Sequence, residues 1–300
     1  LHQDQIDELI TLPLSYTQTN GSIPLRTAIS RQYEGCDRDN VIVTNGSAEA
    51  NFIATWVTLT PGDELVYMLP NYMQIWGVAQ NSGATIVPIT VREELGWQID
   101  LDELVDTVSS RTKVISVCNP NNPTGSILTE ETRDLLVDLA RSCDAWILAD
   151  EVYRGAELLD MDTPSFWGKY EKVVVTGGLS KAYGLPGLRI GWLVGPKDFI
   201  SMSWTAKDYT TIAPGALSDK IATFVLDPSL KSQIFERNKT ILNDNLSYLQ
   251  GWMSDQNTVL KLIPPKAGGM AFLRYDLNIG STELANRLRN EESVLLVPGD

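Results

Sequence analysis

Short apolar runs alternate with longer stretches of mixed polarity over most of the chain. Runs such as VISVC and VVVT are rich in β-branched residues and lack a polar face. This composition is typical of strands that are buried on both faces of a sheet. The predicted strands are Val41–Thr44, Glu64–Met68, Thr85–Ile89, Lys113–Cys118, Ala145–Ala149, Lys172–Thr176 and Ile190–Val194.

Helical segments are predicted between these strands. Thr129 is a suitable N-cap for one of them, and Glu130 and Glu131 would lie in its positively polarised first turn. The predicted helices are Ser47–Leu59, Tyr72–Asn81, Asp100–Val108 and Glu130–Ser142. The alternation predicts an α/β fold in which helices flank a mostly parallel sheet.

The pattern changes after Pro214. Two helices are followed by proline and glycine pairs and then by shorter elements, and we expect residues 1–248 to form a large domain and residues 249–300 to begin a smaller α+β domain. The chain begins without Met and ends directly after an apolar run, so we expect it to be part of a longer protein. The predicted elements here are helices Ala216–Leu226, Leu230–Met253 and Thr282–Arg289, and strands Met270–Tyr275 and Val294–Val297.

Composition and charge narrow the classes of function. The 300 residues are 43% hydrophobic and 21% charged, which suits a packed core and not a disordered chain. A formal net charge of −14 disfavours nucleic acid as a partner, because phosphates would be repelled. No apolar run approaches the roughly 18 residues of a membrane span, and no signal peptide is visible.

Histidine and cysteine usage disfavours several catalytic chemistries. His2 is the only histidine, so Ser-His-Asp and Cys-His catalysis and ordinary zinc sites are disfavoured, and no metal site is predicted. Cys36, Cys118 and Cys143 show no CxxC spacing. We expect them to be reduced thiols, which fits a cytoplasmic protein.

Polar and glycine-rich segments follow four of the predicted strands. They are Asn45-Gly46-Ser47, Asn119–Gly125, Asp150–Tyr153 and Gly177–Lys181. Open α/β sheets bind ligands at the carboxyl ends of their strands. The four segments are therefore expected to meet in one site.

A lysine and an arginine in the last segment suggest the chemistry of that site. Lys181 follows a buried strand, and Arg189 lies eight residues later at the start of another. Lysine forms Schiff bases with carbonyl compounds, and arginine binds phosphate through two hydrogen bonds. Together they would suit a phosphorylated aldehyde, although an ordinary exposed lysine is the alternative for Lys181 taken alone.

The segment SKAYGLPGLRIGW resembles the lysine signature of the class I/II aminotransferases, which have fold type I and use pyridoxal 5′-phosphate (PLP). The resemblance implies that Lys181 forms a Schiff base with the cofactor and carries the proton of the reaction. It also implies that Ser180 and Arg189 bind the cofactor phosphate. Gly178 stands where many members carry a serine, which would remove one phosphate contact.

Two further motifs match the family in order. In ADEVY, Asp150 is expected to pair with the pyridine nitrogen, because a protonated ring is the better electron sink. Tyr153 of the same motif and Asn122 of NPTG are expected to bond the phenolic oxygen. Glu151 is interpreted as structural.

The remaining site residues come from three motifs. In TNGSAEA, Ser47 and Ala48 are expected to offer backbone N–H groups to the phosphate at a helix N-terminus. Tyr72 of LPNYMQIW would stack on the cofactor ring. Tyr16 begins YTQTNGSIPLR, where the family's tyrosine reaches the cofactor phosphate of the neighbouring subunit, so a homodimer with shared active sites is implied.

The resemblance implies an aminotransferase that moves an amino group between an amino acid and a 2-oxo acid. Lyase, cyclase or β/γ-replacement chemistry on the same scaffold is the first alternative. A non-catalytic PLP-binding regulator is a weaker alternative, because no basic DNA-binding segment is visible. The arginine that binds the substrate carboxylate in this family is expected beyond Asp300, and no arginine near the C-terminus lies in its motif.

Overall fold

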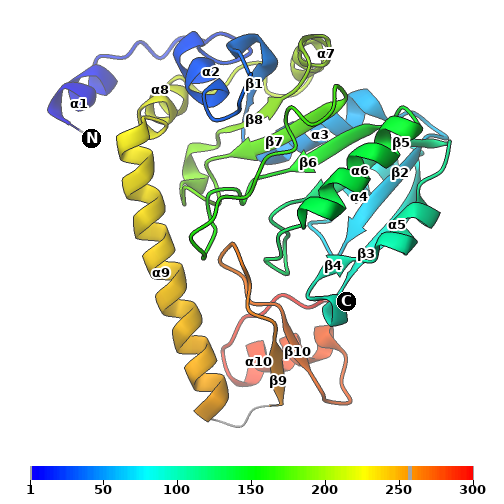
Figure 1. Cartoon of the computed structure of the whole chain (residues 1–300). Helices are drawn as coiled ribbons and strands as arrows, with labels where there is room; N and C mark the ends of the chain where they lie inside the picture. The colour runs from blue at the N-terminus through cyan, green and yellow to red at the C-terminus, as the bar shows by residue number, and fades with distance from the viewer. Residues whose placement is uncertain (1, 256–258, 300) are drawn as a thin grey trace.

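The computed structural model describes residues 2–255 and 259–299, which contain a large sheet and a small one (Figure 1). The strands of the large sheet are β1 (Val41–Thr44), β2 (Glu64–Leu69), β3 (Thr85–Arg92), β4 (Gln98–Ile99), β5 (Thr112–Cys118), β6 (Trp146–Asp150), β7 (Val173–Gly178) and β8 (Gly191–Val194). The small sheet pairs β9 (Leu260–Leu262) with β10 (Leu273–Tyr275).

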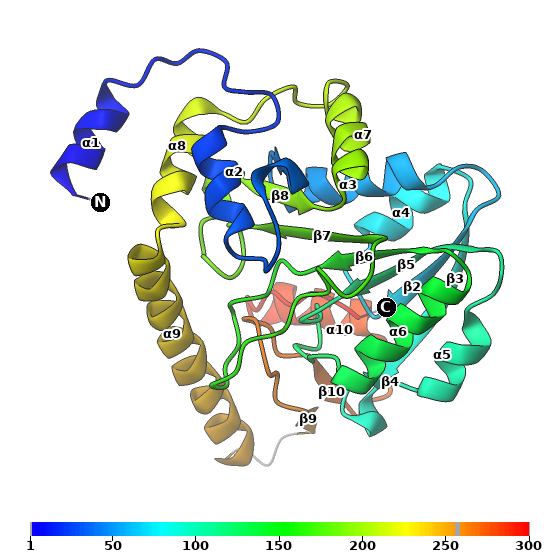
Figure 2. The same cartoon turned by 45° about the horizontal axis from the view of Figure 1, so that its top comes forward.

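Helices lie on both faces of the large sheet (Figure 2). The α-helices of the described part of the chain, including those that lie away from this sheet, are α1 (Gln3–Ile10), α2 (Ile23–Ser30), α3 (Ser47–Thr58), α4 (Gln74–Asn81), α5 (Leu101–Thr107), α6 (Glu130–Ser142), α7 (Lys197–Lys207), α8 (Ala216–Val225), α9 (Pro228–Asp255) and α10 (Ser281–Glu291). Within residues 2–255 and 259–299, no helix combines the length and the apolar character that crossing a bilayer requires.

The strand order of the large sheet is β1-β8-β7-β6-β5-β2-β3-β4. The run from β7 through β6, β5 and β2 to β3 is parallel, while β8, β1 and β4 pair antiparallel. The predicted α/β class with a mostly parallel sheet is therefore confirmed. Since parallel strands all point the same way, their carboxyl ends meet along one edge of the sheet.

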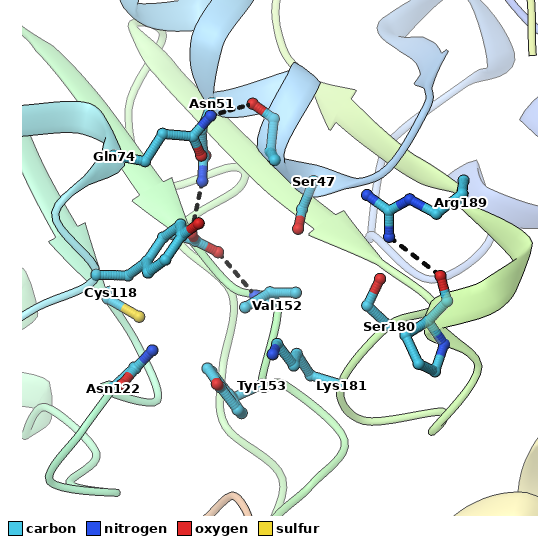
Figure 3. A pocket seen from close by; sticks show the side chains of 14 residues that line it. Ser47, Asn51, Gln74, Cys118, Asn122, Val152, Tyr153, Ser180, Lys181 and Arg189 are labelled. Atoms are coloured by element: carbon cyan, nitrogen blue, oxygen red, sulfur yellow. Dashed lines mark hydrogen bonds between the residues drawn. The ribbon is translucent and has the colours of Figure 1, made fainter. Parts of the chain in front are cut away.

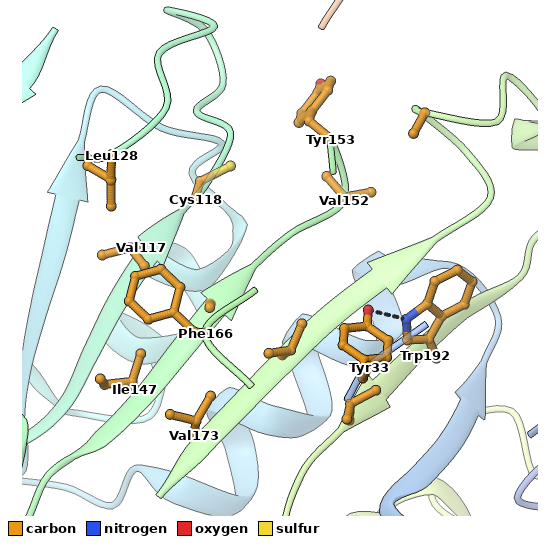
Figure 4. Packing of buried hydrophobic residues seen from close by; sticks show 14 of the residues in the cluster. Tyr33, Val117, Cys118, Leu128, Ile147, Val152, Tyr153, Phe166, Val173 and Trp192 are labelled. Atoms are coloured by element: carbon orange, nitrogen blue, oxygen red, sulfur yellow. Dashed lines mark hydrogen bonds between the residues drawn. The ribbon is translucent and has the colours of Figure 1, made fainter. Parts of the chain in front are cut away.

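Alternation along each strand divides the core into two layers. On β7, Val173 and Val175 pack into the cluster that contains Phe166 (Figure 4), whereas Val174 packs on the other face with Phe199. The first layer also holds buried residues of α5 and α6, and the second holds residues of α3, α4 and α7. Both faces of the strands are buried, which explains why their sequences carry no polar face.

Several predicted elements agree with the structure in detail. The bounds of α6 and β1 are those predicted, and the other predicted strands of the large sheet differ by a few residues at their ends. The predicted helix from Tyr72 begins two residues later, at Gln74, and the predicted strand from Met270 is reduced to β10. Helix α9 runs without a break across position 248, where a domain boundary was expected.

The predicted strand Val294–Val297 is wrong. These residues are 44% to 93% exposed and pair with no strand in the described parts of the chain. An apolar run becomes a strand only where a neighbouring backbone accepts and donates its hydrogen bonds. Within residues 259–299, the backbone hydrogen bond of this run joins Val294 N–H to Leu288 O of α10 at 3.1 Å, which is a bond to a helix and not to a strand.

Glu151 fixes the loop that leaves β6. Its buried carboxylate accepts hydrogen bonds from the Ser165 hydroxyl at 2.9 Å and from the Phe166 backbone N–H at 2.8 Å. Arg154 lies 3.9 Å away, and burial raises the pKa of Glu151 to about 7 in spite of it. The side chain ties two segments of the loop together, as the structural interpretation of Glu151 requires.

We expect Glu151→Gln to change how stability depends on pH, because Gln keeps an acceptor but does not ionise. The folded-state pKa of Glu151 is raised. Its favourable contribution to the free energy of unfolding is therefore complete below about pH 4.5 and is lost as the pH rises through about 7. Over that interval the free energy of unfolding of the wild type should fall by about 1–3 kcal/mol relative to that of the variant. Urea unfolding at pH 5 and pH 8 measures this.

The control is Glu236→Gln, which neutralises an exposed carboxylate on α9. Its unfolding should follow the wild type at both pH values. Parallel pH dependences for Glu151→Gln and the wild type would contradict the account.

Candidate active site

One cavity of about 230 Å³ opens at the carboxyl ends of the central strands (Figure 3). It lies where the segments after β1, β5, β6 and β7 meet, as the positions of the polar segments predict. The residues that line it are Ser47, Ala48, Asn51, Tyr72, Gln74, Cys118, Asn122, Asp150, Val152, Tyr153, Ser180, Lys181, Pro186 and Arg189. All the nominated site residues except Tyr16 therefore come together in one place.

Asp150 ends β6 at the floor of the cavity. Its Oδ2 accepts a hydrogen bond from Asn51 Nδ2 at 2.8 Å, and its Oδ1 accepts one from the Val152 backbone N–H at 3.1 Å. In the described part of the chain no Lys or Arg forms an ion pair with this carboxylate, which is only 8% exposed. Burial therefore raises the pKa of Asp150, and the hydrogen bonds oppose that rise.

Lys181 follows β7 on a loop whose backbone is held by hydrogen bonds. The N–H of Leu179 donates to Ile190 O at 3.0 Å, and the N–H of Gly184 donates to Lys181 O at 2.9 Å. The lysine side chain is exposed to the cavity and makes no hydrogen bond or ion pair with another described residue. A fixed backbone and an unpaired amine leave Lys181 available to a bound molecule.

Arg189 and the start of α3 form a cationic corner of the cavity. Arg189 Nη1 donates to Pro186 O at 3.1 Å, and Nη2 donates to Asn45 O at 3.4 Å. No side chain caps the N-terminus of α3, so its first N–H groups, at Ser47 and Ala48, face the cavity uncapped. This arrangement suits an anion such as a phosphate.

Gly46 is required by the same corner. Its φ of +89° lies in the left-handed region, and a Cβ at this position would lie 2.3 Å from Arg189 Nη2. Any other residue would be strained and would push the guanidinium aside. The positive φ and the close approach of Arg189 therefore explain why the TNGSAEA motif carries glycine at position 46.

The opposite side of the cavity carries the aromatic and amide groups. Tyr153 is 6% exposed, and its hydroxyl lies 3.8 Å from the sulfur of Met270. Asn122 belongs to the loop after β5, and Tyr72 is 57% exposed at the mouth of the cavity. Tyr72 is anchored through its backbone carbonyl, which accepts the Tyr67 hydroxyl at 2.7 Å.

Tyr16 lies outside this cavity. It is 85% exposed and lines a separate, shallower hollow with Leu14, Pro214 and Leu217. The segment is tied down by Thr17, whose hydroxyl donates to Pro214 O at 2.9 Å. The chain alone therefore gives Tyr16 no contact with the groups around Lys181.

Three polar residues of the cavity were not nominated from the sequence: Asn51, Gln74 and Cys118. Asn51 lies four residues after Ser47 on α3, and this helical spacing could have indicated that both face the same way. Gln74 donates from Nε2 to Ala48 O at 2.8 Å and thereby joins α4 to α3. Cys118 ends β5 directly beside Asp150 in the sheet register.

Comparison with known proteins identifies the family of the chain. The family model described as "Aminotransferase class I and II" matches residues 13–300. A capreomycidine synthase from Streptomyces vinaceus is 31% identical over 93% of this chain and 71% of its own length. An arginine–pyruvate transaminase from Pseudomonas aeruginosa is 30% identical over 65% of this chain and 51% of its own length.

Solved structures give the same result. A PLP-dependent aminotransferase from Streptococcus suis superposes with a TM-score of 0.93 at 32% identity, covering 99% of this chain and 78% of that one. The chain belongs to the aminotransferase class I and II family, and PLP is the cofactor of that family. It spans between about half and about three quarters of the length of these relatives.

Proposed function

We propose that this chain carries the PLP site of an aminotransferase, which moves an amino group between an amino acid and a 2-oxo acid. The observation that supports this most directly is the convergence of an unpaired lysine, a buried carboxylate and a cationic corner in one cavity. Each of the three suits a different part of PLP. In this proposal Lys181 is the residue that holds the cofactor.

Asp150 suits the pyridine nitrogen. A buried carboxylate without an ion pair is unfavourable, and a protonated ring nitrogen would supply the missing positive charge. When bound, PLP supplies an electron sink for the negative charge that develops at the substrate Cα. Asp150 strengthens this sink by favouring the protonated ring.

The cationic corner suits the cofactor phosphate. Arg189 can donate two hydrogen bonds to it, and the uncapped N–H groups of Ser47 and Ala48 can donate others. The Ser180 hydroxyl borders the same corner. Gly178 contributes no side chain, so α3 and Arg189 would carry most of the phosphate binding.

The remaining nominated groups would orient the ring. Asn122 and Tyr153 line the side of the cavity that would face the phenolic oxygen, where both can donate a hydrogen bond. Burial raises the pKa of Tyr153, so its hydroxyl keeps the proton that it would donate. The exposed ring of Tyr72 would stack on the cofactor at the mouth of the cavity.

Lys181 would also move the reacting proton. Its Nζ would take the proton from the substrate Cα and would then deliver that proton to the cofactor. The Lys181 Nζ would be free for this role once a substrate amine takes its place on the cofactor. The hydrogen-bonded backbone around Lys181 holds the base of this side chain at the cavity wall.

We also propose a homodimer in which Tyr16 reaches the phosphate in the partner's cavity. Its exposure, together with that of Leu14 and Leu217 around the neighbouring hollow, supports a covered surface. We further propose that a smaller domain begins near residue 249.

We also propose a cytoplasmic location for the protein, because its three cysteines form no disulfide.

A second candidate keeps the cofactor and changes the reaction. The 31% identity with a capreomycidine synthase supports lyase, cyclase or replacement chemistry on the same residues. Product analysis separates the candidates. Amino transfer yields an oxo acid and leaves the cofactor aminated, whereas elimination releases ammonia and leaves it unchanged.

We expect the wild type to convert members of an amino-acid panel into oxo acids in a single turnover, without ammonia. Lys181→Ala should lose this reaction by at least about 10³-fold, because both the attachment and the proton carrier are removed. Rapid quench with mass analysis of the products measures it. Ammonia release by the wild type would favour the second candidate, and full activity of Lys181→Ala would exclude the role of Lys181.

We expect Gly46→Ala to weaken PLP binding about 10-fold or more, because its Cβ would displace Arg189. Binding of pyridoxal, which lacks the phosphate, should change much less. Titration of the cofactor-free protein with both compounds measures the difference. Gly96→Ala is the control, since Gly96 has a φ of +66° and open space around it. Equal losses for PLP and pyridoxal would contradict the phosphate assignment.

We expect Tyr16→Phe to weaken PLP binding about 10-fold, the effect of losing one hydrogen bond to a charged group. The chain's own cavity does not contain Tyr16, so a loss can come only through a partner subunit. Sedimentation measurements would establish the oligomeric state in parallel. Tyr248→Phe, on an exposed tyrosine of α9, is the control. Unchanged affinity, or a loss in a monomeric protein, would count against the shared site.

A further inference from the structure

Helix α3 brings an amide to the carboxylate at the floor of the cavity. Asn51 is 3% exposed, and its Nδ2 donates to Asp150 Oδ2 at 2.8 Å (Figure 3). The Oδ1 atom of the same amide has no hydrogen-bond partner in the described part of the chain. The contact with Asp150 is therefore the hydrogen bond that this buried side chain makes.

The direction of that bond selects the charge state of Asp150. An ionised carboxylate only accepts hydrogen bonds, whereas a protonated one also donates. A donating amide therefore favours the ionised form, and the Val152 backbone N–H acts in the same sense. Opposing both is burial, which by itself favours the protonated form.

The other titratable groups around Asp150 come from four elements. Cys118 ends β5, Tyr67 lies on β2, Tyr153 follows β6 and Lys181 follows β7. Burial raises the pKa of the thiol and of both phenols, so these three stay neutral near pH 7. Lys181 is the basic group among them, and its Nζ would become part of a Schiff base when it holds the cofactor.

We propose that Asn51 is a positioning residue that keeps Asp150 ionised and aimed at the cofactor's ring nitrogen. This inference rests on the proposed PLP site. It assigns two tasks to α3: its first N–H groups would bind the phosphate, and Asn51 would hold Asp150 toward the ring nitrogen. Asn51 acts through Asp150 and touches no reacting atom.

Removing the donor should weaken the ring contact most at low pH. In Asn51→Leu the hydrogen bond to a charged acceptor is lost, so Asp150 should titrate about one pH unit higher than in the wild type. A protonated Asp150 cannot pair with a protonated ring. The loss of PLP affinity relative to the wild type should therefore be largest at the low-pH end of the range, at most about 10-fold, and should vanish near pH 9.

Two measurements test this. The first is infrared titration of the Asp150 carboxyl in the cofactor-free protein, assigned by its loss in Asp150→Asn. The second is binding of PLP and of a carbocyclic analogue, in which carbon replaces the ring nitrogen, at pH 6 to 9. The analogue has no group for Asp150 to pair with, so its affinity should be the same in Asn51→Leu and the wild type.

Two further variants control for simple disruption of the fold. Thr55→Val removes a buried hydroxyl one turn along α3 that bonds Asn51 O and does not touch Asp150. It should leave the Asp150 titration unchanged. Asn51→His retains a ring N–H donor, and it should bring the titration and the PLP affinity back toward the wild-type values even if Asn51→Leu folds poorly.

The outcomes separate this inference from the function on which it rests. A wild type that does not bind PLP would overturn the proposed function itself. A wild type that binds PLP would overturn only the role of Asn51 under either of two results: an unchanged Asp150 titration in Asn51→Leu, or equal losses for PLP and the carbocyclic analogue. A higher titration with selective loss of PLP would support it.

Discussion

A carboxylate buried without an ion pair is the constraint around which this cavity is arranged. Asp150 ends a central strand, with an amide of α3 and a backbone N–H as its hydrogen-bond donors. Burial disfavours the charged form of such a carboxylate, so the group lowers stability unless a bound molecule supplies the opposite charge. A cofactor with a protonated nitrogen turns this unfavourable charge into a binding contact. Lys181, Arg189 and the start of α3 then lie where the rest of that cofactor would be held.

The sheet explains why these residues meet although they are far apart in the sequence. Strands β5, β6 and β7 are parallel neighbours, and the register sets Cys118 beside Asp150 and Asp150 beside Thr176. The segments that follow the three strands therefore emerge together at one edge. Antiparallel β8 returns from this edge, so Arg189 just before it lies close to Lys181. Gly46 lets the guanidinium approach α3 closely.

Much of this arrangement could be predicted from the sequence, for identifiable reasons. Strands buried on both faces leave continuous apolar runs, and α6 combines a clear N-cap with an apolar stripe, so both were found. Helices α2 and α7 were missed because their buried faces include polar residues such as Arg26, Ser203 and Lys207. The polar residues shorten the apolar stripe of these helices and so weaken the local pattern, although α2 begins with an N-cap at Ser22 and a proline in its first turn.

In the site, too, some residues could be recognised from their own motifs, whereas the roles of others depend on contacts with distant parts of the chain. Motif residues with their own chemistry, such as Lys181 and Asp150, could be named from the chain alone. Asn51 could not be assigned a task, because its role depends on a hydrogen bond to a residue 99 positions away. Tyr16 illustrates the opposite limit. Its predicted contact needs a second subunit, and the fold of one chain leaves it outside the cavity.

The central claim is that Lys181 holds PLP in this cavity, and chemical trapping tests it most directly. The purified protein would be reconstituted with PLP, reduced with borohydride, digested and mapped by mass spectrometry. The account predicts a visible absorption band that reduction removes and one phosphopyridoxyl-labelled peptide, with the label on Lys181. A label on another lysine, or no label at all under saturating PLP, would contradict it.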